Sequence, residues 1–522
     1  MSDALFGKVI RGRTAAPTLR ESADVVVIGT GAGGSMALYE LARRGLRCIA
    51  IERGSMIGPA EMNQLEDRMI PHLFAESGAR ATVDRTVNIL QGQGVGGSTL
   101  HNTNLCKRAP APIIARWRDE LGLALDGLED DYAAVEAMLK VRTVPEDRVN
   151  ANNHILARGI EALGYRGGRL SENRDDRCQQ SGFCELGCAY NGKTNAFRML
   201  IPPAVEAGAT VLTDARVDRI EHDGAQATSV RGRLFDPTRN RPIGEFMISA
   251  RAVVLAGSAT GSAALHIASG LPDPHGRAGV GLHLHPGAAV LGLHDDPVEG
   301  WRGIPQSVEC TEFLDFDPGA AHRVWIVSGF AHPAGAAALL PGFGPGHAAL
   351  MRQYARASVA IAMVHDETEG RVSPGEGDNL RIRYAMNDDD RAQVALGLRE
   401  TARLLLAGGA RRVVVPLNPP IVVETERDIE QLTVDLIRPC SPTFTAVHPM
   451  STMRMSASPE DGVVDESGRH HFIDNLWIAD GSLLPTSIGG PPQVTIYTLG
   501  RRVGRAVADA LTAGQPAALT AE

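Results

Sequence analysis

The sequence predicts an α/β protein whose first domain is Rossmann-like, and residues 24–54 carry that prediction. Residues 25–28 are a continuous apolar run, as expected for a parallel strand that is buried on both faces. A glycine-rich turn and a helical pattern follow, and residues 48–51 form a second apolar run. Strand, glycine turn, helix and strand in this order predict a βαβ unit.

The turn between the first strand and the helix has the spacing G-x-G-x-x-G, formed by Gly29, Gly31 and Gly34. We expect Gly29 to permit the tight turn, Gly31 to let a pyrophosphate approach, and Gly34 to let the helix pack on the strand. Glu52 ends the second strand, near the ~20-residue offset at which a carboxylate binds a ribose. The complete unit predicts a dinucleotide site, whereas an isolated glycine motif also fits an ordinary βα turn.

Composition excludes several classes of protein. The chain has 522 residues, enough for two or three domains, and its 43% hydrophobic and 22% charged residues are ordinary for a soluble globular protein. A net charge of −9 without a basic run argues against a nucleic-acid partner. The first residues lack a signal-peptide core, and no stretch reaches the ~18 apolar residues of a membrane span. The odd number of cysteines does not suggest a disulfide framework, so we expect a cytoplasmic protein.

A second glycine-rich segment follows a part of the chain that shows no clear period. Residues 56–88 mix polarity, and we expect them to be irregular. Residues 91–102 then read QGQGVGGSTLHN. So many glycines indicate positive φ angles or close approach to a flat ligand. A flexible loop is the alternative, but the polar residues that follow at once favour a binding loop.

These motifs resemble those of the glucose–methanol–choline (GMC) oxidoreductases, which use FAD. The segment GVGGSTLHN after a Rossmann-like unit is similar to the first signature of that family. Residues 254–270 are similar to the second signature, with Ala263 in place of its usual proline. Three further family motifs, L-x-x-H-P, H-P-x-G-T-x-R-M and N-L-W-V-x-D-G-S, are similar to residues 282–286, 448–455 and 475–482. The resemblance covers almost the whole chain.

Within the family, three segments resemble the long-chain alcohol oxidase branch. They are residues 178–193, 301–307 and 384–391. The membrane-spanning segments of some relatives are not visible in this sequence.

The family fold implies a Rossmann-like FAD-binding domain interleaved with a substrate domain built on an antiparallel sheet. We expect the FAD-binding domain in residues 20–110, 195–290 and 440–515, and the substrate-binding domain in residues 111–194 and 291–439. Alternating polarity in residues 380–385 predicts a half-exposed antiparallel strand, and residues 390–407 predict an amphipathic helix. Residues 515–522 are expected to be a frayed tail.

The resemblance implies oxidation of an alcohol, in which a base takes the hydroxyl proton and the α-hydrogen passes as hydride to flavin N5. His448 occupies the position of the family's catalytic histidine, and its ordinary pKa of about 6.5 suits a base. The family's second catalytic group, an asparagine or histidine, corresponds to Pro491, whose side chain can neither donate nor accept. Gln493 could orient the alkoxide instead; otherwise His448 acts alone with backbone or water support.

The resemblance also assigns contacts to FAD. Asp480 and Gly481 correspond to the C-terminal FAD contact, and Val217 corresponds to the backbone contact with the adenine. In some members a histidine at the place of His101 is bonded to the flavin, so an 8α-histidyl link and a dissociable FAD both stay open. The flavin side of the glycine loop is assigned to Gly96, Gly97, Ser98 and Asn102.

Three cysteines, Cys178, Cys184 and Cys188, lie close together in the sequence. Such a spacing can hold an iron–sulfur cluster, as in some sugar dehydrogenases of the family. The long-chain alcohol oxidase branch has four cysteines, and Ser181 replaces the second of them here. A tight loop of partly buried thiols is the alternative, and no fourth ligand for zinc is evident nearby. We expect no metal, and these three residues are the candidate ligands if a cluster is present.

The sequence therefore predicts an FAD-dependent oxidoreductase that acts on a small-molecule alcohol, apolar or bulky, with oxygen or another molecule as electron acceptor. One alternative is a sugar dehydrogenase with an iron–sulfur cluster that passes electrons to an external acceptor. The other is a non-catalytic flavin-binding protein, which only Pro491 favours.

Overall fold

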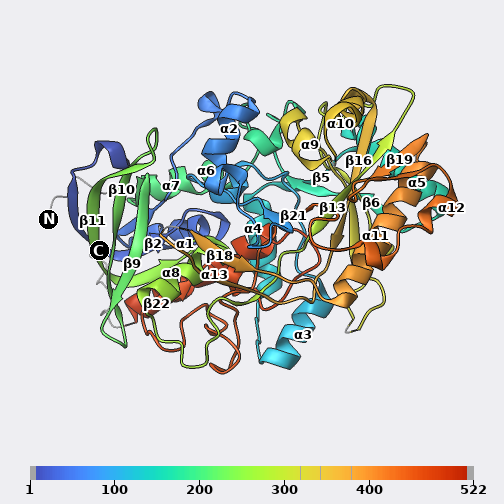
Figure 1. The fold of residues 1–522 in the computed structure, drawn as a ribbon. Helices are drawn as coiled ribbons and strands as arrows, with labels where there is room; N and C mark the ends of the chain where they lie inside the picture. Colours follow the sequence, from blue (N-terminus) through green and yellow to red (C-terminus); the bar gives the residue numbers. More distant parts are fainter. Residues whose placement is uncertain (1–6, 318, 341, 378, 514–522) are drawn as a thin grey trace.

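The computed structural model describes residues 7–317, 319–340, 342–377 and 379–513, so the expected frayed tail, residues 515–522, lies outside the described residues. Two large β-sheets lie next to each other, one on the left of Figure 1 and one on the right. Helices cover both sheets, and long connections cross between them.

The first sheet is mainly parallel, and its strands come from three separate parts of the chain. They are β1 (Val9–Arg11), β2 (Thr18–Ile28), β3 (Cys48–Ile51), β8 (Thr210–Thr213), β9 (Ala215–His222), β10 (Ala227–Asp236), β11 (Arg241–Leu255) and β22 (Leu476–Ile478). The order is β1-β8-β3-β2-β11-β10-β9, and β22 also pairs with β11. The pairs from β1 to β11 and the pair of β11 with β22 are parallel, whereas β10 and β9 continue antiparallel.

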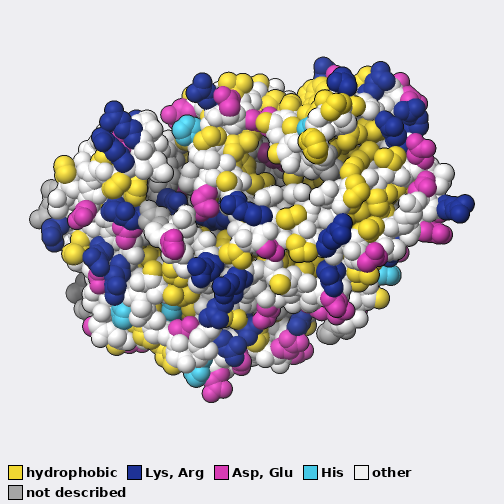
Figure 2. All heavy atoms as spheres, in the orientation of Figure 1, with side chains coloured by type: hydrophobic (Ala, Val, Ile, Leu, Met, Phe, Trp, Pro, Cys, Tyr) yellow, Lys and Arg dark blue, Asp and Glu magenta, His cyan; other side chains and the backbone are white. Residues whose placement is uncertain are grey.

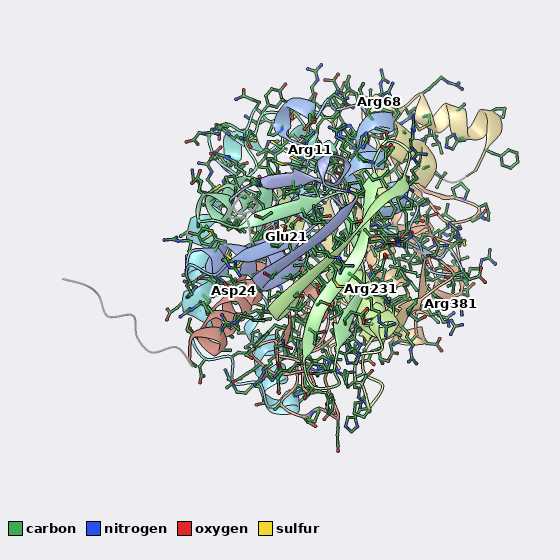
Figure 3. All side chains as sticks on the ribbon, turned by 90° about the vertical axis from the view of Figure 1, so that its left-hand side faces the viewer. Arg11, Glu21, Asp24, Arg68, Arg231 and Arg381 are labelled. Carbon is green, nitrogen blue, oxygen red and sulfur yellow. The ribbon has the colours of Figure 1, made fainter. Side chains whose placement is uncertain are left out.

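The predicted βαβ unit is confirmed. β2 contains the apolar run, β3 has the predicted limits, and α1 (Ala32–Ala42) connects them. β2 begins earlier than its apolar run, because its first half pairs with β11 while carrying polar side chains that face solvent in part. Figure 3 shows two of these acidic side chains, Glu21 and Asp24, on the large sheet.

Helices α1 and α13 (Gln493–Thr512) pack closely against each other beside this sheet. Gly500 of α13 makes the approach possible, since a Cβ there would lie 2.5 Å from the carbonyl oxygen of Gly33. The helix α8 (Ser258–Ser269) lies against β9 of the same sheet. The N-terminus of α1 is thereby fixed between the sheet and the C-terminal helix.

The second sheet is mostly antiparallel. It consists of β4 (Val87–Ile89), β6 (Gly167–Arg169), β13 (Gly287–Leu293), β14 (Val308–Cys310), β15 (Val324–Ser328), β16 (Ala357–Val364), β19 (Arg412–Val415), β20 (Ile421–Val423) and β21 (Phe444–Ala446). Its main order is β20-β19-β13-β16-β15-β14-β6, while β21 joins β13 and β4 joins β21. The helices α5 (Ala151–Leu163) and α11 (Asp388–Ala407) pack together over the sheet.

The fold is therefore an FAD-domain-like parallel sheet interleaved in the chain with an antiparallel sheet, as predicted. The expected boundary after residue 290 falls inside β13, and β4 and β21 pair with the second sheet although their residues were assigned to the first domain. The exact domain limits stay a prediction.

Two smaller sheets complete the strands of the described residues: β12 (Val280–Leu282), β17 (Gly370–Pro374) and β18 (Leu380–Arg383) form one, and β5 (Val141–Thr143) and β7 (Ser171–Asn173) form the other. The predicted half-exposed strand is confirmed as β18, with Ile382 buried between exposed Arg381 and Arg383. The predicted helix is confirmed as α11. It begins two residues early because the Asn387 side chain accepts a hydrogen bond from the Asp390 amide at 2.7 Å.

Residues 56–88 are not irregular throughout, which corrects the expectation. They contain α2 (Glu66–Leu73), whose residues Met69 and Leu73 are four apart and buried. The charged first turn and Pro71 inside the helix conceal this pattern in the sequence. The Glu66 carboxylate accepts hydrogen bonds from the amides of Ala334 and Gly335 at 2.8 and 2.9 Å. It thereby ties α2 to the start of α9 (Pro333–Leu339).

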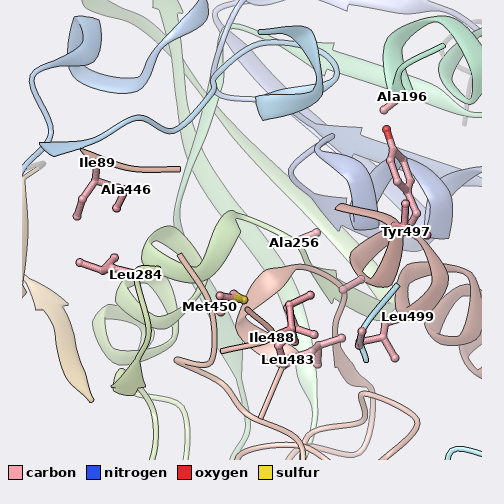
Figure 4. Close-up of a cluster of buried hydrophobic side chains, with 14 of the residues drawn as sticks. Ile89, Ala196, Ala256, Leu284, Ala446, Met450, Leu483, Ile488, Tyr497 and Leu499 are labelled. Atoms are coloured by element: carbon pink, nitrogen blue, oxygen red, sulfur yellow. The ribbon is translucent and has the colours of Figure 1, made fainter. Parts of the chain in front are cut away.

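The remaining helices are α3 (Ala111–Leu121), α4 (Leu128–Met138), α6 (Ala196–Met199), α7 (Ile201–Glu206), α10 (Gly344–Met351) and α12 (Glu426–Ile429). In the part of the chain that the structure describes, no helix is both long enough and apolar enough to cross a membrane. Buried side chains from distant segments meet in one core that passes from sheet to sheet. Figure 4 shows part of it, including Ile89 beside Ala446, with Leu284 and Met450 nearby.

Candidate active site

A cavity of about 1360 Å³ lies between the two sheets and is lined by residues of both. On one side it is bounded by the ends of β2 and β3 and by the beginning of α1. On the other side it is bounded by β13, β15 and β16. Most residues that the sequence singled out line it: Gly29, Gly31, Glu52, Gly97, Ser98, His101, Asn102, Val217, His448, Asp480, Gly481 and Gln493. Gly34, Gly96 and the three clustered cysteines do not.

The three glycines of the first turn have different surroundings. Gly29 has a φ angle of +103°, which favours glycine, and a Cβ there would lie 2.2 Å from the carbonyl oxygen of Ala256. A Cβ on Gly34 would lie 2.2 Å from the carbonyl oxygen of Gly29, so this glycine lets α1 pack on the turn. A Cβ on Gly31 would meet nothing within 4 Å. Gly31 therefore leaves open space where the cavity reaches the helix.

The beginning of α1 is suited to an anionic group. The first amides of a helix have no partner within the helix, and the helix dipole favours negative charge there. Gly31 is the residue that precedes α1, and it lines the cavity together with Ala32 and Gly33. Backbone amides without a side chain above them are thus available to a pyrophosphate.

Glu52 is buried at the end of β3 and is held by four hydrogen-bond donors. Its Oε2 accepts from the Thr30 amide and hydroxyl at 3.1 and 2.6 Å. Its Oε1 accepts from the amides of Gly54 and Gly94 at 2.9 and 3.2 Å. Burial raises the pKa of this carboxyl, while the hydrogen bonds oppose the rise. Besides lining the cavity, Glu52 joins the first turn to the glycine-rich segment.

The glycine-rich segment is a compact turn, with φ angles of +111° at Gly96 and +54° at Gly97. A Cβ on Gly97 would lie 2.8 Å from the Cα of Gly31, so the two glycine turns touch each other. The Ser98 hydroxyl oxygen accepts a hydrogen bond from the Gly92 amide at 2.8 Å. The segment is therefore a fixed part of the cavity wall, and the alternative of a flexible loop is wrong.

His101 is buried at the end of this turn. Its ring lies against that of Phe74, with 4.0 Å between the ring centres, and its Nε2 has no hydrogen-bond partner in the described residues. Burial and then the positive charge of Lys193 lower the pKa of His101 to about 3. His101 is accordingly a neutral imidazole with one unused nitrogen in the wall of the cavity.

Lys193 fixes the backbone behind His101. Its ammonium group is buried and donates hydrogen bonds to the carbonyl oxygens of Leu100, Asn102 and Cys184, at 3.1, 2.5 and 3.0 Å. These three hydrogen bonds hold the two backbone segments together firmly, because charged hydrogen bonds are stronger than neutral ones. The sequence analysis missed this residue, since nothing in the segment distinguishes it from a surface lysine.

Asp480, Gly481 and Val217 line the cavity on the side of the first sheet. Asp480 is buried and accepts hydrogen bonds from the hydroxyls of Ser262 and Ser482, both at 2.5 Å, and from the Ser482 amide at 2.8 Å. Burial raises its pKa against these hydrogen bonds. The segment containing Asp480 also packs closely against α1: a Cβ on Gly33 would lie 2.0 Å from the carbonyl oxygen of Ala479. The motif had not pointed to Gly33.

His448 lines the cavity just after β21, and its ring contacts a second histidine. The Nδ1 atoms of His448 and His285 are 2.9 Å apart, and the ring centres are separated by 5.1 Å. Burial is the main cause that lowers the pKa of His448 well below its ordinary value, and the neighbouring His285 adds to the effect, against the opposing charge of Asp366. The imidazole is therefore neutral at pH 7. The sequence analysis noted the motif that contains His285 but not this contact.

Pro491, Gln493 and Asn102 line the same cavity as His448. Pro491 lines the cavity where the family resemblance expects a polar side chain. The Gln493 amide nitrogen donates to the Leu105 carbonyl oxygen at 2.6 Å and to the Asn173 amide oxygen at 3.2 Å. The Gln493 amide oxygen accepts from Asn102 at 2.9 Å. The other end of the Asn102 amide, Oδ1, has no partner in the described residues.

The three clustered cysteines lie outside the cavity. Among the described residues, no group of three or more His, Cys, Asp or Glu side chains has an arrangement that could hold a metal ion. Burial raises the pKa of Cys184 to about 12, and the Cys188 sulfur accepts a hydrogen bond from the Gly192 amide at 3.2 Å. A metal ligand must be a thiolate, and burial disfavours that state at Cys184.

FAD fits these residues. The open cradle at Gly31, the free amides of α1 and the unpartnered Nε2 of His101 lie around one cavity, and a neutral histidine faces the same space. A dinucleotide site beside a histidine that can take a proton is typical of an oxidoreductase that uses a dinucleotide cofactor. The comparisons identify it further.

The chain belongs to the GMC oxidoreductase family. Two family models, both described as GMC oxidoreductase, match residues 70–287 and 366–500. A third, described as an FAD binding domain, matches residues 24–60. The protein is therefore an FAD-dependent oxidoreductase that acts on CH–OH groups.

The relatives agree with this assignment. An uncharacterised GMC-type oxidoreductase of Mycobacterium tuberculosis is 34% identical over 91% of this chain and 74% of its own length. Long-chain-alcohol oxidase FAO3 of Arabidopsis thaliana is 26% identical over 95% of this chain and 69% of its own. Pyridoxine 4-oxidase from Mesorbium loti has a similar fold, with a TM-score of 0.70 at 20% identity over 92% of this chain and 98% of that chain.

Proposed function

We propose that the protein oxidises an apolar or bulky alcohol to the corresponding carbonyl compound, with His448 as the base. The observation that carries the proposal is a neutral histidine that lines the cavity and has one ring nitrogen, Nδ1, engaged by His285. Its other nitrogen, Nε2, is left for the substrate hydroxyl. Bound FAD supplies the acceptor for the α-hydrogen, which leaves as hydride.

The state of His448 supports this role. A base must be unprotonated before the reaction, and the lowered pKa of His448 keeps it so at neutral pH. Burial also weakens the competition of water for the proton-accepting nitrogen. The rate of flavin reduction should accordingly show no loss of an essential base between pH 9 and pH 7.

The oxygen atom of the substrate also needs a partner. We assign this role to the second N–H of the Asn102 amide nitrogen, since the side chain lines the cavity and its other N–H is held by Gln493. Gln493 would act through Asn102 and not directly, because both ends of its own amide are engaged. This arrangement gives Gln493 a positioning role.

The apolar part of the cavity wall favours an apolar substrate. Trp325, Ile361 and Met363 come from the second sheet, and Phe330 and Leu339 come from the segment that includes α9. Figure 2 shows hydrophobic side chains gathered over α9 and α10, where Phe343 is 92% exposed. An apolar wall that continues to the surface suits an apolar alcohol better than a sugar, which needs many hydrogen bonds.

We further propose oxygen as the electron acceptor and the cytoplasm as the location. Relatives with similar sequence or fold are named oxidases, which supports oxygen. The cysteines of the described residues are all free thiols, which suits a reducing compartment. The net charge of −9 speaks against a nucleic-acid partner.

An anaerobic substrate screen tests the proposal. The holoenzyme is mixed without oxygen with long-chain primary alcohols, benzylic alcohols and aldose sugars, and the flavin absorbance is followed. We expect apolar alcohols to bleach the flavin and sugars to leave it oxidised. Bleaching by sugars alone would favour the sugar dehydrogenase, and a flavin that none of these compounds reduces would contradict the proposed substrate class.

A further inference from the structure

The pairing of His448 with His285 raises the question of which ring carries the proton between them. Two Nδ1 atoms 2.9 Å apart make a hydrogen bond only if one of them bears hydrogen and the other does not. Each neutral imidazole has a single N–H, so the choice made at Nδ1 also determines the state of Nε2. The pair therefore links the buried contact to the nitrogen of His448 that faces the cavity.

Only one of the two arrangements leaves His448 able to act as a base. If His285 donates, His448 carries its own hydrogen on Nε2 and cannot accept a proton there. If His448 donates from Nδ1, its Nε2 has a free lone pair. The acceptor at His285 is then what selects the reactive form of His448.

His285 itself is held firmly behind the cavity wall. It lies between β12 and β13, is fully buried and does not line the cavity. Its backbone amide donates to the Asp366 carboxylate at 3.2 Å, and the preceding amide of Leu284 donates to the same carboxylate at 2.8 Å. Its ring is stacked against that of Trp325, with 6.2 Å between the ring centres. These contacts fix the position of the ring.

The tautomer of His285, by contrast, is free to follow its neighbour. Its Nε2 has no hydrogen-bond partner in the described residues, so no other contact there selects which ring nitrogen bears the hydrogen. A ring with a fixed position and an unconstrained tautomer can accept at Nδ1.

We propose that His285 is a positioning residue that accepts a hydrogen bond from Nδ1 of His448 and thereby makes Nε2 of His448 the base. This role belongs to a histidine between β12 and β13, and it is separate from the contact with the substrate oxygen that Pro491 cannot make. The inference rests on the proposed role of His448.

The step that His285 supports is a proton transfer from the substrate to His448. The O–H bond of the alcohol breaks, and its proton forms a bond to Nε2 of His448. His448 is then an imidazolium whose Nδ1–H still donates to His285, and no proton needs to pass to His285. The acceptor at His285 stabilises this cation, as a carboxylate does for histidine in catalytic triads.

Three variants separate this role from packing. His285→Phe keeps a flat ring of similar size but has no acceptor, and we expect it to retain FAD and to slow anaerobic flavin reduction roughly 10²- to 10³-fold, with little change in KM. His285→Asn offers an oxygen near the place of Nδ1 and should recover the rate to within about 10-fold of the natural protein.

The matched control is His266→Asn. His266 belongs to another buried histidine pair, in which its Nε2 lies 2.9 Å from that of His470, and neither residue lines the cavity. This control should reduce its flavin at the natural rate.

A spectroscopic measurement locates this hydrogen directly. In the holoenzyme labelled with ¹⁵N-histidine, the signals of His448, assigned by their loss in His448→Ala, should show hydrogen on Nδ1 and none on Nε2. In His285→Phe the hydrogen should move to Nε2. Hydrogen on Nε2 of His448 in the natural holoenzyme, or reduction of His285→Phe at the natural rate, would overturn the proposal.

The outcomes also distinguish this inference from the proposed function. If His448→Ala is slow and His285→Phe is fast, His448 keeps its role and only the role of His285 fails. If His448→Ala itself reduces its flavin at the natural rate, the proposed base is wrong, and the role of His285 fails with it.

Discussion

Gly31 and Gly33 stand two residues apart at the start of α1 and have opposite surroundings. Gly31 faces open space in the cavity, whereas a side chain on Gly33 would meet the backbone of Ala479. We expect that a side chain at the first position would occupy space needed by the cofactor. A side chain at the second position would clash with the protein backbone.

Gly31→Ala should consequently impair FAD binding without impairing folding. The φ angle of Gly31 is −67°, which alanine adopts readily, and its methyl group would occupy only the space meant for the pyrophosphate. We expect FAD affinity to fall roughly 100-fold or more, which corresponds to about 2.7 kcal/mol. Titration of the apoprotein with FAD measures this change.

Gly33→Ala is the matched comparison. Its Cβ would lie 2.0 Å from a backbone oxygen, so the free energy of unfolding of the apoprotein should fall by roughly 3 kcal/mol. If Gly31→Ala bound FAD normally, the cofactor would not approach the turn as described here. The sequence motif pointed to Gly31 but not to Gly33, because the constraint on Gly33 comes from a segment more than 400 residues away.

At the scale of elements, the loop that carries Cys178, Cys184 and Cys188 is tied to the glycine-rich segment by Lys193. Its backbone is held by the ammonium group of Lys193, which donates to the Cys184 carbonyl oxygen at 3.0 Å. Burial keeps the Cys184 thiol protonated by raising its pKa to about 12. The loop thus supports the wall behind His101.

We expect anaerobically purified protein to contain less than stoichiometric iron and to show the absorption spectrum of flavin alone. Cys184→Ser should leave both the iron content and the spectrum unchanged. Stoichiometric iron that disappears in Cys184→Ser would contradict this prediction and would favour the dehydrogenase with an iron–sulfur cluster. Elemental analysis and absorption spectroscopy on the two proteins are sufficient.

Elements with a simple period could be predicted from the sequence, and others could not. β3 and α11 have a clear apolar pattern and were found almost to their ends. The first half of β2 was not predicted, because its side chains are mostly polar although its backbone pairs with β11. The helix α2 was not predicted, because only two of its residues are buried. Both owe their conformation to neighbours that the local sequence does not reveal.

At the scale of the whole molecule, many buried histidines connect stability to pH. Burial lowers the pKa of five of them to between about 3 and about 4: His101, His266, His285, His365 and His470. Below the ordinary histidine pKa of about 6.5 the unfolded chain binds protons that the folded chain does not, so the free energy of unfolding falls as the pH falls. Above about 6.5 these histidines cause no change.

Four buried carboxyl groups act in the opposite direction, since burial raises the pKa of Glu52 and Asp480 as well as of Glu172 and Glu185. Burial raises the pKa of Glu172 to about 8 and of Glu185 to about 7, so the folded chain binds their protons above the ordinary carboxyl range. Because these four are outnumbered by the histidines, we expect the urea midpoint of unfolding to fall progressively from pH 6.5 to pH 4. Tryptophan fluorescence at several pH values measures it, and an unchanged midpoint at pH 5 would contradict the expectation.

The organisation of the whole chain could be predicted further than its active site. Ordered family motifs implied the interleaved sheets and the cofactor, and most of the expected cofactor residues line one cavity. The contacts of Lys193 and His285 could not be predicted, since each joins segments that are distant in the sequence through an atom whose partner the sequence does not identify.

The central claim is that His448 takes the proton of an alcohol, and the rate of flavin reduction in a single turnover tests it most directly. Holoenzyme and His448→Ala are mixed anaerobically with the best substrate from the screen, and the flavin absorbance is followed in a stopped-flow instrument. Equal FAD content in the two proteins confirms that the site is intact. We expect His448→Ala to be reduced roughly 10²- to 10⁴-fold more slowly, the usual contribution of a positioned base. Reduction of this variant at the natural rate would contradict the claim.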